Sequence, residues 1–366
     1  MEQIDIAIIG GGVVGLSIAS ALFKKGRSIC LLEKHPRMGL EASTHNSGVI
    51  HAGLYYPQNT LKTKLCIEGR KLLYTFCKKY RIPHSQCGKL IVCSKSSEIP
   101  ALELLATQGQ SNGLEDLRLV DQLFCKKKEP SIKAKAAIWS PSTGIIEPEA
   151  LVRTLTHLAS QHGVALLTET CVKNGSATPH GVELITQHEQ IHARLVINAA
   201  GLYADQIAKM LGGHLDKIYP VRGEYAELAP RTDLFINGLI YPLPEQSGHG
   251  LGIHLTKTTW GTVIVGPTAK YQTSKTDYEQ NRLPLELFYD SARHLVPNLH
   301  LNDLKLGNTG IRATCRHPNE NFSDFIIGRD LSVPTLIHVG GIDSPGLTAC
   351  LAIGKMVSKL VDETLN

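Results

Sequence analysis

The first 33 residues alternate between apolar runs and a glycine turn. Residues 4–9 are almost entirely aliphatic, three glycines follow at positions 10–12, and residues 14–22 resume with helical spacing. Gly26 fits a helix C-cap, and residues 28–33 form a second apolar run that ends at Glu33. This pattern predicts a compact βαβ unit.

The rest of the chain contains further helical and extended patterns. The helical patterns cover residues 61–80, 99–107, 148–162 and 346–360, and the extended ones cover residues 89–93, 164–168, 194–198 and 334–339. Residues 215–305 alternate short apolar runs with Gly and Pro, as at 238–243, 250–255 and 261–265, which is typical of antiparallel β structure.

These patterns predict an α/β fold, α+β overall, with two interleaved domains. Residues 1–82, 145–214 and 306–366 are expected to form a Rossmann-like dinucleotide-binding domain. Residues 83–144 and 215–305 are expected to form a mostly antiparallel β-sheet domain.

Composition narrows the class of protein. The chain has 366 residues, 42% hydrophobic and 19% charged, which is typical of a globular protein large enough for two domains. Its net charge of +5 is spread thinly, with one tight basic run at residues 126–128, so we expect no nucleic acid partner. Nine cysteines without a C-x-x-C pair indicate reduced thiols in a cytoplasmic setting and no zinc site.

The N-terminus and the hydropathy pattern bear on location. Glu2 and Asp5 stand where a signal peptide carries basic residues, and no apolar run approaches the roughly 20 residues that span a bilayer. We therefore expect a cytoplasmic protein, and peripheral contact with the inner face of a membrane remains open. The sequence does not predict the oligomeric state.

The glycine turn carries the first chemical signal. Gly10, Gly12 and Gly15 follow the G-x-G-x-x-G spacing, and Glu33 ends the next strand 18 residues after Gly15. The glycines allow a tight turn, approach of a pyrophosphate and close packing of helix on strand, while the carboxylate accepts from a ribose hydroxyl. We interpret the segment as a dinucleotide site, although a tight structural turn is the alternative. Glu33 disfavours a cofactor with a phosphorylated ribose, but the motif does not separate flavin from nicotinamide.

A second segment distinguishes between these cofactors. Residues 44–56, Thr-His-Asn-Ser-Gly-Val-Ile-His-Ala-Gly-Leu-Tyr-Tyr, resemble the loop of flavoproteins of the D-amino-acid oxidase and glycerol-3-phosphate dehydrogenase superfamily. Within it, the chain is most similar to the L-2-hydroxyglutarate dehydrogenases. Further matching segments follow in the family's order at residues 64–69, 222–225, 240–244, 251–256, 265–269 and 310–313. One departure is the Gly346-Leu347 pair, where small residues are expected.

The resemblance implies that the cofactor is FAD and that the second domain binds the substrate. The residues it implies for FAD are Gly10, Gly12, Gly15, Glu33, Lys34, Thr44, His45, Asn46, Ser47, Gly48, Val172, Ala200, Gly201, Gly346, Leu347 and Thr348.

The resemblance also implies residues for the reaction. Arg312 is expected to hold the substrate carboxylate, because a guanidinium binds it bidentately, although a structural ion pair is the alternative. His51 and His254 compete for the role of base, and we favour His51, while either could instead hold a loop. Tyr241 and Lys257 are candidates for contacts with the substrate hydroxyl and the distal carboxylate, with a core position as the alternative for Tyr241. No histidine pair has metal-site spacing, so we expect no metal.

Arg222 is the least determined of these candidates. It could bind the same substrate anion, or it could brace the flavin loop. The sequence does not decide between these two roles.

The expected function is that of an FAD-dependent oxidoreductase acting on CH–OH donors. It would oxidise an L-2-hydroxy acid, with L-2-hydroxyglutarate as the favoured substrate, and pass electrons to a quinone or another carrier. The alternatives are a glycerol-3-phosphate dehydrogenase or oxidase, an amino-acid oxidase, and a non-enzymatic flavin-binding sensor or scaffold.

Overall fold

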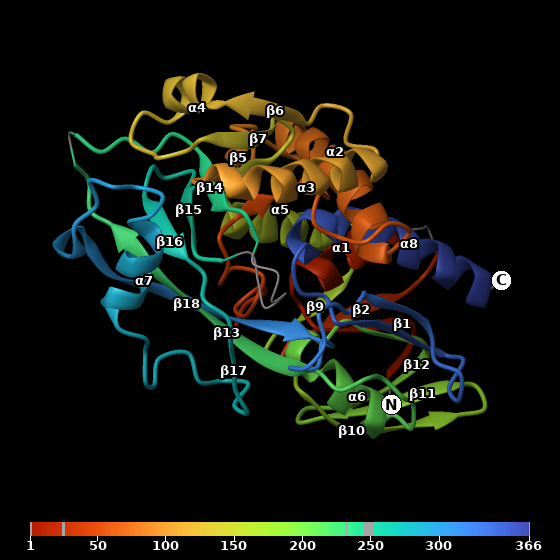
Figure 1. The fold of residues 1–366 in the computed structure, drawn as a ribbon. Coiled ribbons are helices and arrows are strands. Elements are labelled where there is room, and N and C mark those ends of the chain that lie inside the picture. Colours follow the sequence, from red (N-terminus) through yellow and green to blue (C-terminus); the bar gives the residue numbers. More distant parts are fainter. Residues whose placement is uncertain (1, 24–25, 232, 245–251, 366) are drawn as a thin grey trace.

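Two large sheets organise the protein, together with a small three-stranded one. The computed structural model describes residues 2–23, 26–231, 233–244 and 252–365. Within this part, strands assemble into sheets of eight, nine and three strands. Figure 1 shows the eight-stranded sheet beneath helices α1 and α8, with much of the nine-stranded sheet on the opposite side of the molecule near helix α7.

The eight-stranded sheet has a parallel centre. Its parallel strands are β9 (Ala165–Leu167), β2 (Ile29–Leu32), β1 (Glu2–Ile9), β12 (Gln190–Asn198) and β20 (Leu336–Gly340). Antiparallel strands extend it: β10 (Val172–Thr178), β11 (Gly181–Thr186) and β19 (Ile326–Arg329).

Both faces of the parallel centre are buried. Ile6 and Ile8 of β1 share one core with four helices, and Ala7 and Ile9 point into a second core on the other face. The first core involves α1 (Val13–Ala21), α2 (Leu61–Tyr80), α5 (Pro148–Gln161) and α8 (Gly346–Leu365), and the second involves α6 (Ala204–Met210). Where both faces of a strand are buried, as at residues 6–9, 29–32 and 195–197, the sequence is a continuous apolar run.

The nine-stranded sheet is antiparallel except where β14 pairs with β5. Its strands are, in order, β17 (Lys270–Tyr271), β13 (Tyr219–Leu228), β16 (Val263–Gly266), β15 (His254–Lys257), β14 (Leu239–Pro242), β5 (Lys89–Cys93), β7 (Ala136–Ser140) and β6 (Arg118–Asp121), with β18 (Leu304–Thr314) paired to β13.

Alternate residues of β5 show how the two faces of this sheet are covered. Leu90 and Val92 pack in a core with α7 (Leu285–Ala292) and α4 (Gln122–Lys128), whereas Ile91 and Cys93 pack in a core with α3 (Ile99–Ser111). This period of two follows from the pleat of a strand. The odd-numbered side of β5 therefore faces the core that contains Tyr241 and Leu54.

Short elements complete the fold. The three-stranded sheet contains β3 (Val49–Ile50), β8 (Gly144–Ile146) and β4 (His84–Ser85). Single 3-10 turns are η1 (Ser96–Glu98), η2 (Gly201–Tyr203) and η3 (Leu301–Asp303). No helix in the described ranges is long and apolar enough to cross a bilayer.

The predicted mixed α/β architecture is confirmed, and so is the β1–α1–β2 unit at the N-terminus. The β10–β11 hairpin was not predicted, because most of β10 is exposed and carries no apolar pattern. The expected strand at 250–255 begins at His254, and its residues 250 and 251 lie outside the described part. The domain boundaries stay a prediction, although β18, which we expected from residue 306 in the dinucleotide-binding domain, pairs in the nine-stranded sheet.

Candidate functional site

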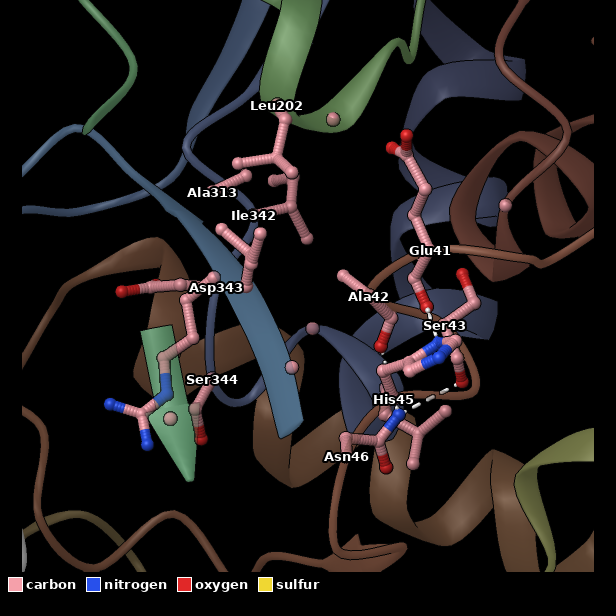
Figure 2. A pocket seen from close by; sticks show the side chains of 18 of the residues that line it. Glu41, Ala42, Ser43, His45, Asn46, Leu202, Ala313, Ile342, Asp343 and Ser344 are labelled. Carbon is pink, nitrogen blue, oxygen red and sulfur yellow. Dashed lines mark hydrogen bonds between the residues drawn. The ribbon is translucent and has the colours of Figure 1, made fainter. Parts of the chain in front are cut away.

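A cavity of about 1250 Å³ is lined by residues from both large sheets. Its wall includes the β1–α1 turn, the 39–51 loop, the end of β12, parts of β13 and β18, and the start of α8. Figure 2 shows Glu41, Ala42, Ser43, His45 and Asn46 on one side of the pocket, with Asp343 and Ser344 across from them. Drug-sized ligands occupy pockets of about 300–1,000 Å³, so this cavity has room for a large cofactor and a small substrate.

The glycine turn forms a cradle at one end of the cavity. Gly10 has φ +111°, and a side chain there would collide with the carbonyl oxygen of Ala199. A side chain at Gly15 would collide in the same way with the carbonyl oxygen of Gly10, so Gly15 acts in packing and does not line the cavity. The N-terminus of α1 starts at this turn, where backbone N–H groups favour an anion.

Glu33 lies beside this cradle and lines the cavity. Its two carboxylate oxygens accept hydrogen bonds from the backbone N–H groups of Gly11, at 2.8 Å, and His35, at 2.9 Å. These bonds orient the carboxylate, which still has lone pairs for a ribose hydroxyl.

Lys34 also lines the cavity, where it pairs with Glu41 at 2.7 Å and lies 3.5 Å from the ring centroid of Tyr203. Burial alone would lower the pKa of Lys34, but Glu41 and Tyr203 raise it overall. The lysine therefore stays charged.

Twelve of the sixteen predicted cofactor residues line the cavity: Gly10, Gly12, Glu33, Lys34, His45, Asn46, Ser47, Val172, Ala200, Gly201, Gly346 and Leu347. The other four, Gly15, Thr44, Gly48 and Thr348, lie behind the wall and support it. The Thr44 hydroxyl donates to Gly39 O at 2.7 Å, and the Gly48 N–H donates to Asn46 Oδ1 at 2.8 Å. Thr348 Oγ1 accepts from the N–H of His51 at 3.0 Å, so this threonine positions the histidine loop.

Arg312 is an uncompensated cation in the cavity wall. It lies on β18 opposite Val221, and within the described residues its guanidinium has neither an ion-pair partner nor a hydrogen bond. A charge left without an acid beside an open cavity fits an anionic ligand.

Both candidate bases line the same cavity. His51 Nε2 lies 3.3 Å from Ser344 Oγ, and its buried Nδ1 has no hydrogen-bond partner in the described ranges. His254 Nδ1 lies 2.8 Å from Gly252 O, which must accept, so Nδ1 carries the proton and Nε2 keeps a free lone pair.

Burial sets the protonation of these imidazoles. It lowers the pKa of His51 well below the usual value, with further contributions from Lys89 and His254. Burial also lowers the pKa of His254 to about 3, against the bond to Gly252 O. Both rings are therefore neutral near pH 7 and able to accept a proton.

Tyr241 stacks on His254 in the cavity wall, with ring centroids 3.6 Å apart and planes 18° apart. The side chain is buried on β14 and packs in the core beside α3. Tyr241 is thus both a core residue and a wall residue.

Arg222, for which the sequence left open a substrate contact or a bracing role, and Lys257, a candidate substrate contact, do not line the cavity. Arg222 is buried and pairs with Glu224 at 2.9 Å, and it donates to the carbonyl oxygens of Gln280 and Asn281. Lys257 lies on β15 three residues after His254, so the pleat directs it to the opposite face of the sheet.

Several residues of this region were missed from the sequence. Tyr55 lines the cavity, as does Lys62, which pairs with Asp343 at 2.7 Å. Lys89 is 1% exposed, and its Nζ lies 4.4 Å from the ring centroid of Tyr55 and 4.5 Å from that of Tyr241. The available signal was a lysine that opens the otherwise apolar run 89–93.

No cluster of three His, Cys, Asp or Glu side chains suited to a metal ion occurs among the described residues. All nine cysteines are unpaired.

Comparisons with known proteins agree with this geometry. A family model described as FAD dependent oxidoreductase matches residues 5–360. The chain is 34% identical to the mitochondrial L-2-hydroxyglutarate dehydrogenase of Arabidopsis thaliana, over 98% of this chain and 83% of the relative. It is 32% identical to the Homo sapiens protein of the same name, over 99% and 89%.

Solved structures are similar over nearly the whole chain. The FAD-bound, dithionite-reduced L-α-glycerophosphate oxidase of Mycoplasma pneumoniae superposes with a TM-score of 0.90 at 29% identity, covering 99% of this chain and 95% of the other. The glycine oxidase of Geobacillus kaustophilus gives a TM-score of 0.84 at 22% identity, with 99% and 95% covered, and shares the fold. The cradle, the cavity and these matches together show that the chain belongs to the family of FAD-dependent oxidoreductases.

Proposed function

We propose that this protein oxidises L-2-hydroxyglutarate to 2-oxoglutarate with bound FAD. The observation that carries the proposal is Arg312, an arginine without an acidic partner in the described residues, in a cavity that also exposes two neutral imidazoles. The relatives named L-2-hydroxyglutarate dehydrogenase support the choice of substrate.

The chain's own residues fit the cofactor. Gly10 and Gly12 would receive the pyrophosphate at the start of α1, and Glu33 would accept from the ribose. The loop at 45–47 and the start of α8 would border the flavin. When bound, FAD supplies a two-electron acceptor for the hydride on carbon 2 of the substrate.

Arg312 would bind the α-carboxylate bidentately and fix the orientation of carbon 2. A neutral imidazole would accept the hydroxyl proton as the C–H bond breaks, so the products are the 2-oxo acid and a protonated histidine. We favour His51 as this base, and His254 is the alternative because its Nε2 lone pair is free.

Oxidation of glycerol 3-phosphate is the second candidate, favoured by the similarity to the glycerophosphate oxidase. A phosphate dianion needs several converging cations. Arg222 and Lys257 lie outside the cavity and Lys62 is paired with Asp343, which makes this reaction the weaker proposal. An amino-acid oxidase and a flavin-binding sensor without activity remain the further alternatives.

An anaerobic spectrum tests these reactions together. Flavin-loaded protein is mixed with L-2-hydroxyglutarate, with its D-isomer, with glycerol 3-phosphate and with L-amino acids, and the flavin band is followed. We expect bleaching by L-2-hydroxyglutarate alone. Bleaching by glycerol 3-phosphate or an amino acid instead would refute the proposed substrate, and no bleaching by any compound would favour the sensor.

We also propose that the electrons pass to a quinone or another carrier, that the protein is cytoplasmic, and that it contacts the inner face of a membrane. Its unpaired cysteines support a reducing compartment, whereas the relatives cited above are named as mitochondrial. Turnover with a soluble quinone against turnover with oxygen tests the acceptor, and flotation with vesicles tests the membrane contact. Faster turnover with oxygen would refute the quinone.

A further inference from the structure

Lys89 is a buried lysine without an acidic partner in the part of the chain that the structure describes. It begins β5 on the same side as Ile91 and Cys93, next to the core that contains Tyr241. Lys62, the other buried lysine among the described residues, differs because Asp343 neutralises it at 2.7 Å. Burying an unpaired ammonium group is costly, so the position calls for a compensating group from elsewhere.

The charge of Lys89 stands directly behind the cavity wall. Its Nζ lies 4.4 Å and 4.5 Å from the rings of Tyr55 and Tyr241, and both tyrosines line the cavity. Such cation–π contacts compensate the charge only in part. Burial lowers the pKa of His254, which is also in the wall, to about 3, and Lys89 and Arg312 contribute to this lowering, so both cations act on the same part of the wall.

The same wall contains an unsatisfied donor. The hydroxyl of Tyr55 is buried and has no hydrogen-bond partner in the described ranges. Burial raises the pKa of Tyr55 well above its usual value, so the hydroxyl keeps its proton. A buried hydroxyl without an acceptor is rare in folded proteins, and an acceptor on a ligand would satisfy it.

We propose that Lys89 and the Tyr55 hydroxyl select a dicarboxylate substrate by recognising its second carboxylate, while Arg312 holds the first. The inference rests on the proposed function, and it names the group that separates dicarboxylic from monocarboxylic 2-hydroxy acids. Tyr55 donates to the distal carboxylate, and Lys89 acts from behind the tyrosines as a positioning charge. Two uncompensated cations then match a substrate with two negative charges.

Paired substrates test this directly. L-2-hydroxyglutarate and L-2-hydroxypentanoate have the same chain length, but the second carries a methyl group in place of the distal carboxylate. We expect Lys89→Met to lower kcat/KM for the dicarboxylate by about 10- to 150-fold, mainly through KM, because the distal carboxylate loses the attraction of this buried charge. The value for the monocarboxylate should stay within about twofold, since no second carboxylate is present.

Further variants sharpen the result. Lys89→Arg should restore part of the preference for the dicarboxylate, and Tyr55→Phe should reduce it with little change for the monocarboxylate. Lys305→Met is the control, because Lys305 is an exposed lysine of the same sheet that pairs with Glu227. Flavin content and the melting temperature verify that each variant is folded.

The possible outcomes separate the two proposals. An equal loss on both substrates would show that Lys89 is only structural and would overturn this inference alone. If Lys257→Met lost the preference for the dicarboxylate and Lys89→Met kept it, the distal contact would belong to Lys257. That result would also overturn this inference. Wild-type protein that oxidises neither acid would overturn the proposed function and this inference with it.

Discussion

Arg222 and Lys89 are both buried cations of the nine-stranded sheet, but their surroundings differ. Arg222 contacts Glu224 at 2.9 Å and the carbonyl oxygens of Gln280 and Asn281 at 2.8 and 3.1 Å. Lys89 contacts two aromatic rings and, in the described residues, no acid. Burial alone therefore does not identify a functional cation. A cation whose neighbours already neutralise it holds the fold, and one that lacks such neighbours beside a cavity is available to a ligand.

Removing the compensated cation should have the largest effect, and on stability. Arg222→Met leaves Glu224 buried with Arg282, at 2.8 Å, as its remaining cationic partner. We expect a loss of about 3 kcal/mol in the free energy of unfolding, as for other broken buried pairs. Urea unfolding measures it, with Lys305→Met as the control. A loss below about 0.5 kcal/mol would mean that the pair does not stabilise the sheet.

The uncompensated Arg312 should instead affect turnover. Arg312→Met removes a bidentate contact with the α-carboxylate, so we expect kcat/KM for L-2-hydroxyglutarate to fall about 100-fold or more. Arg312→Lys should recover only part of this loss, because an ammonium group acts as a point charge. The stability of both variants should stay close to that of the wild type. Unchanged kinetics in Arg312→Met would remove this residue from the substrate site.

We expect Lys89 to lower the free energy of unfolding when no substrate is bound. Replacing it by Met removes an unpaired buried charge and keeps an apolar chain of similar length, so we expect the free energy of unfolding to rise by about 1 kcal/mol. Chemical unfolding of the substrate-free protein measures the change. A clear decrease would show that the contacts with Tyr55 and Tyr241 outweigh the burial of the charge.

The sequence predicted those parts of the site that depend on local pattern. The Gly10 cradle and Glu33 follow from one strand, one turn and one helix, and the structure places both in the cavity wall. The resemblance added His51, His254 and Arg312, which also line the cavity. Their chemical roles stay predictions until the variants are measured.

Two substrate candidates lie away from the cavity, and the sequence contained a signal for the placement of each. Arg222 and Glu224 are two residues apart on a strand, so they share a face and were able to pair. His254 and Lys257 are three apart, which puts them on opposite faces of a regular strand. For Lys89 the sequence offered only a lysine at the start of an apolar run, because its neighbours Tyr55 and Tyr241 come from distant segments that meet only in the folded protein.

The pH dependence of the reaction should distinguish the neutral imidazoles of His51 and His254 from the buried ammonium group of Lys89. A base with the ordinary histidine pKa of about 6.5 would lose about fourfold in activity between pH 8 and pH 6. Burial, with smaller contributions from Lys89 and His254, lowers the pKa of His51 well below that value, and burial lowers the pKa of His254 to about 3, so neither imidazole should cause this loss.

Lys89 should act in the opposite direction over the same range. Burial lowers its pKa to about 7, against a smaller effect of Cys66, so the ammonium form gains population as the pH falls from 8 to 6. Because the charged form attracts the distal carboxylate, kcat/KM for L-2-hydroxyglutarate should rise by about five- to tenfold toward pH 6. The profiles of L-2-hydroxypentanoate and of Lys89→Met should stay flat. A fourfold fall toward pH 6 in all three profiles would show that the catalytic histidine titrates with an ordinary pKa. Burial would then not lower the pKa of the base.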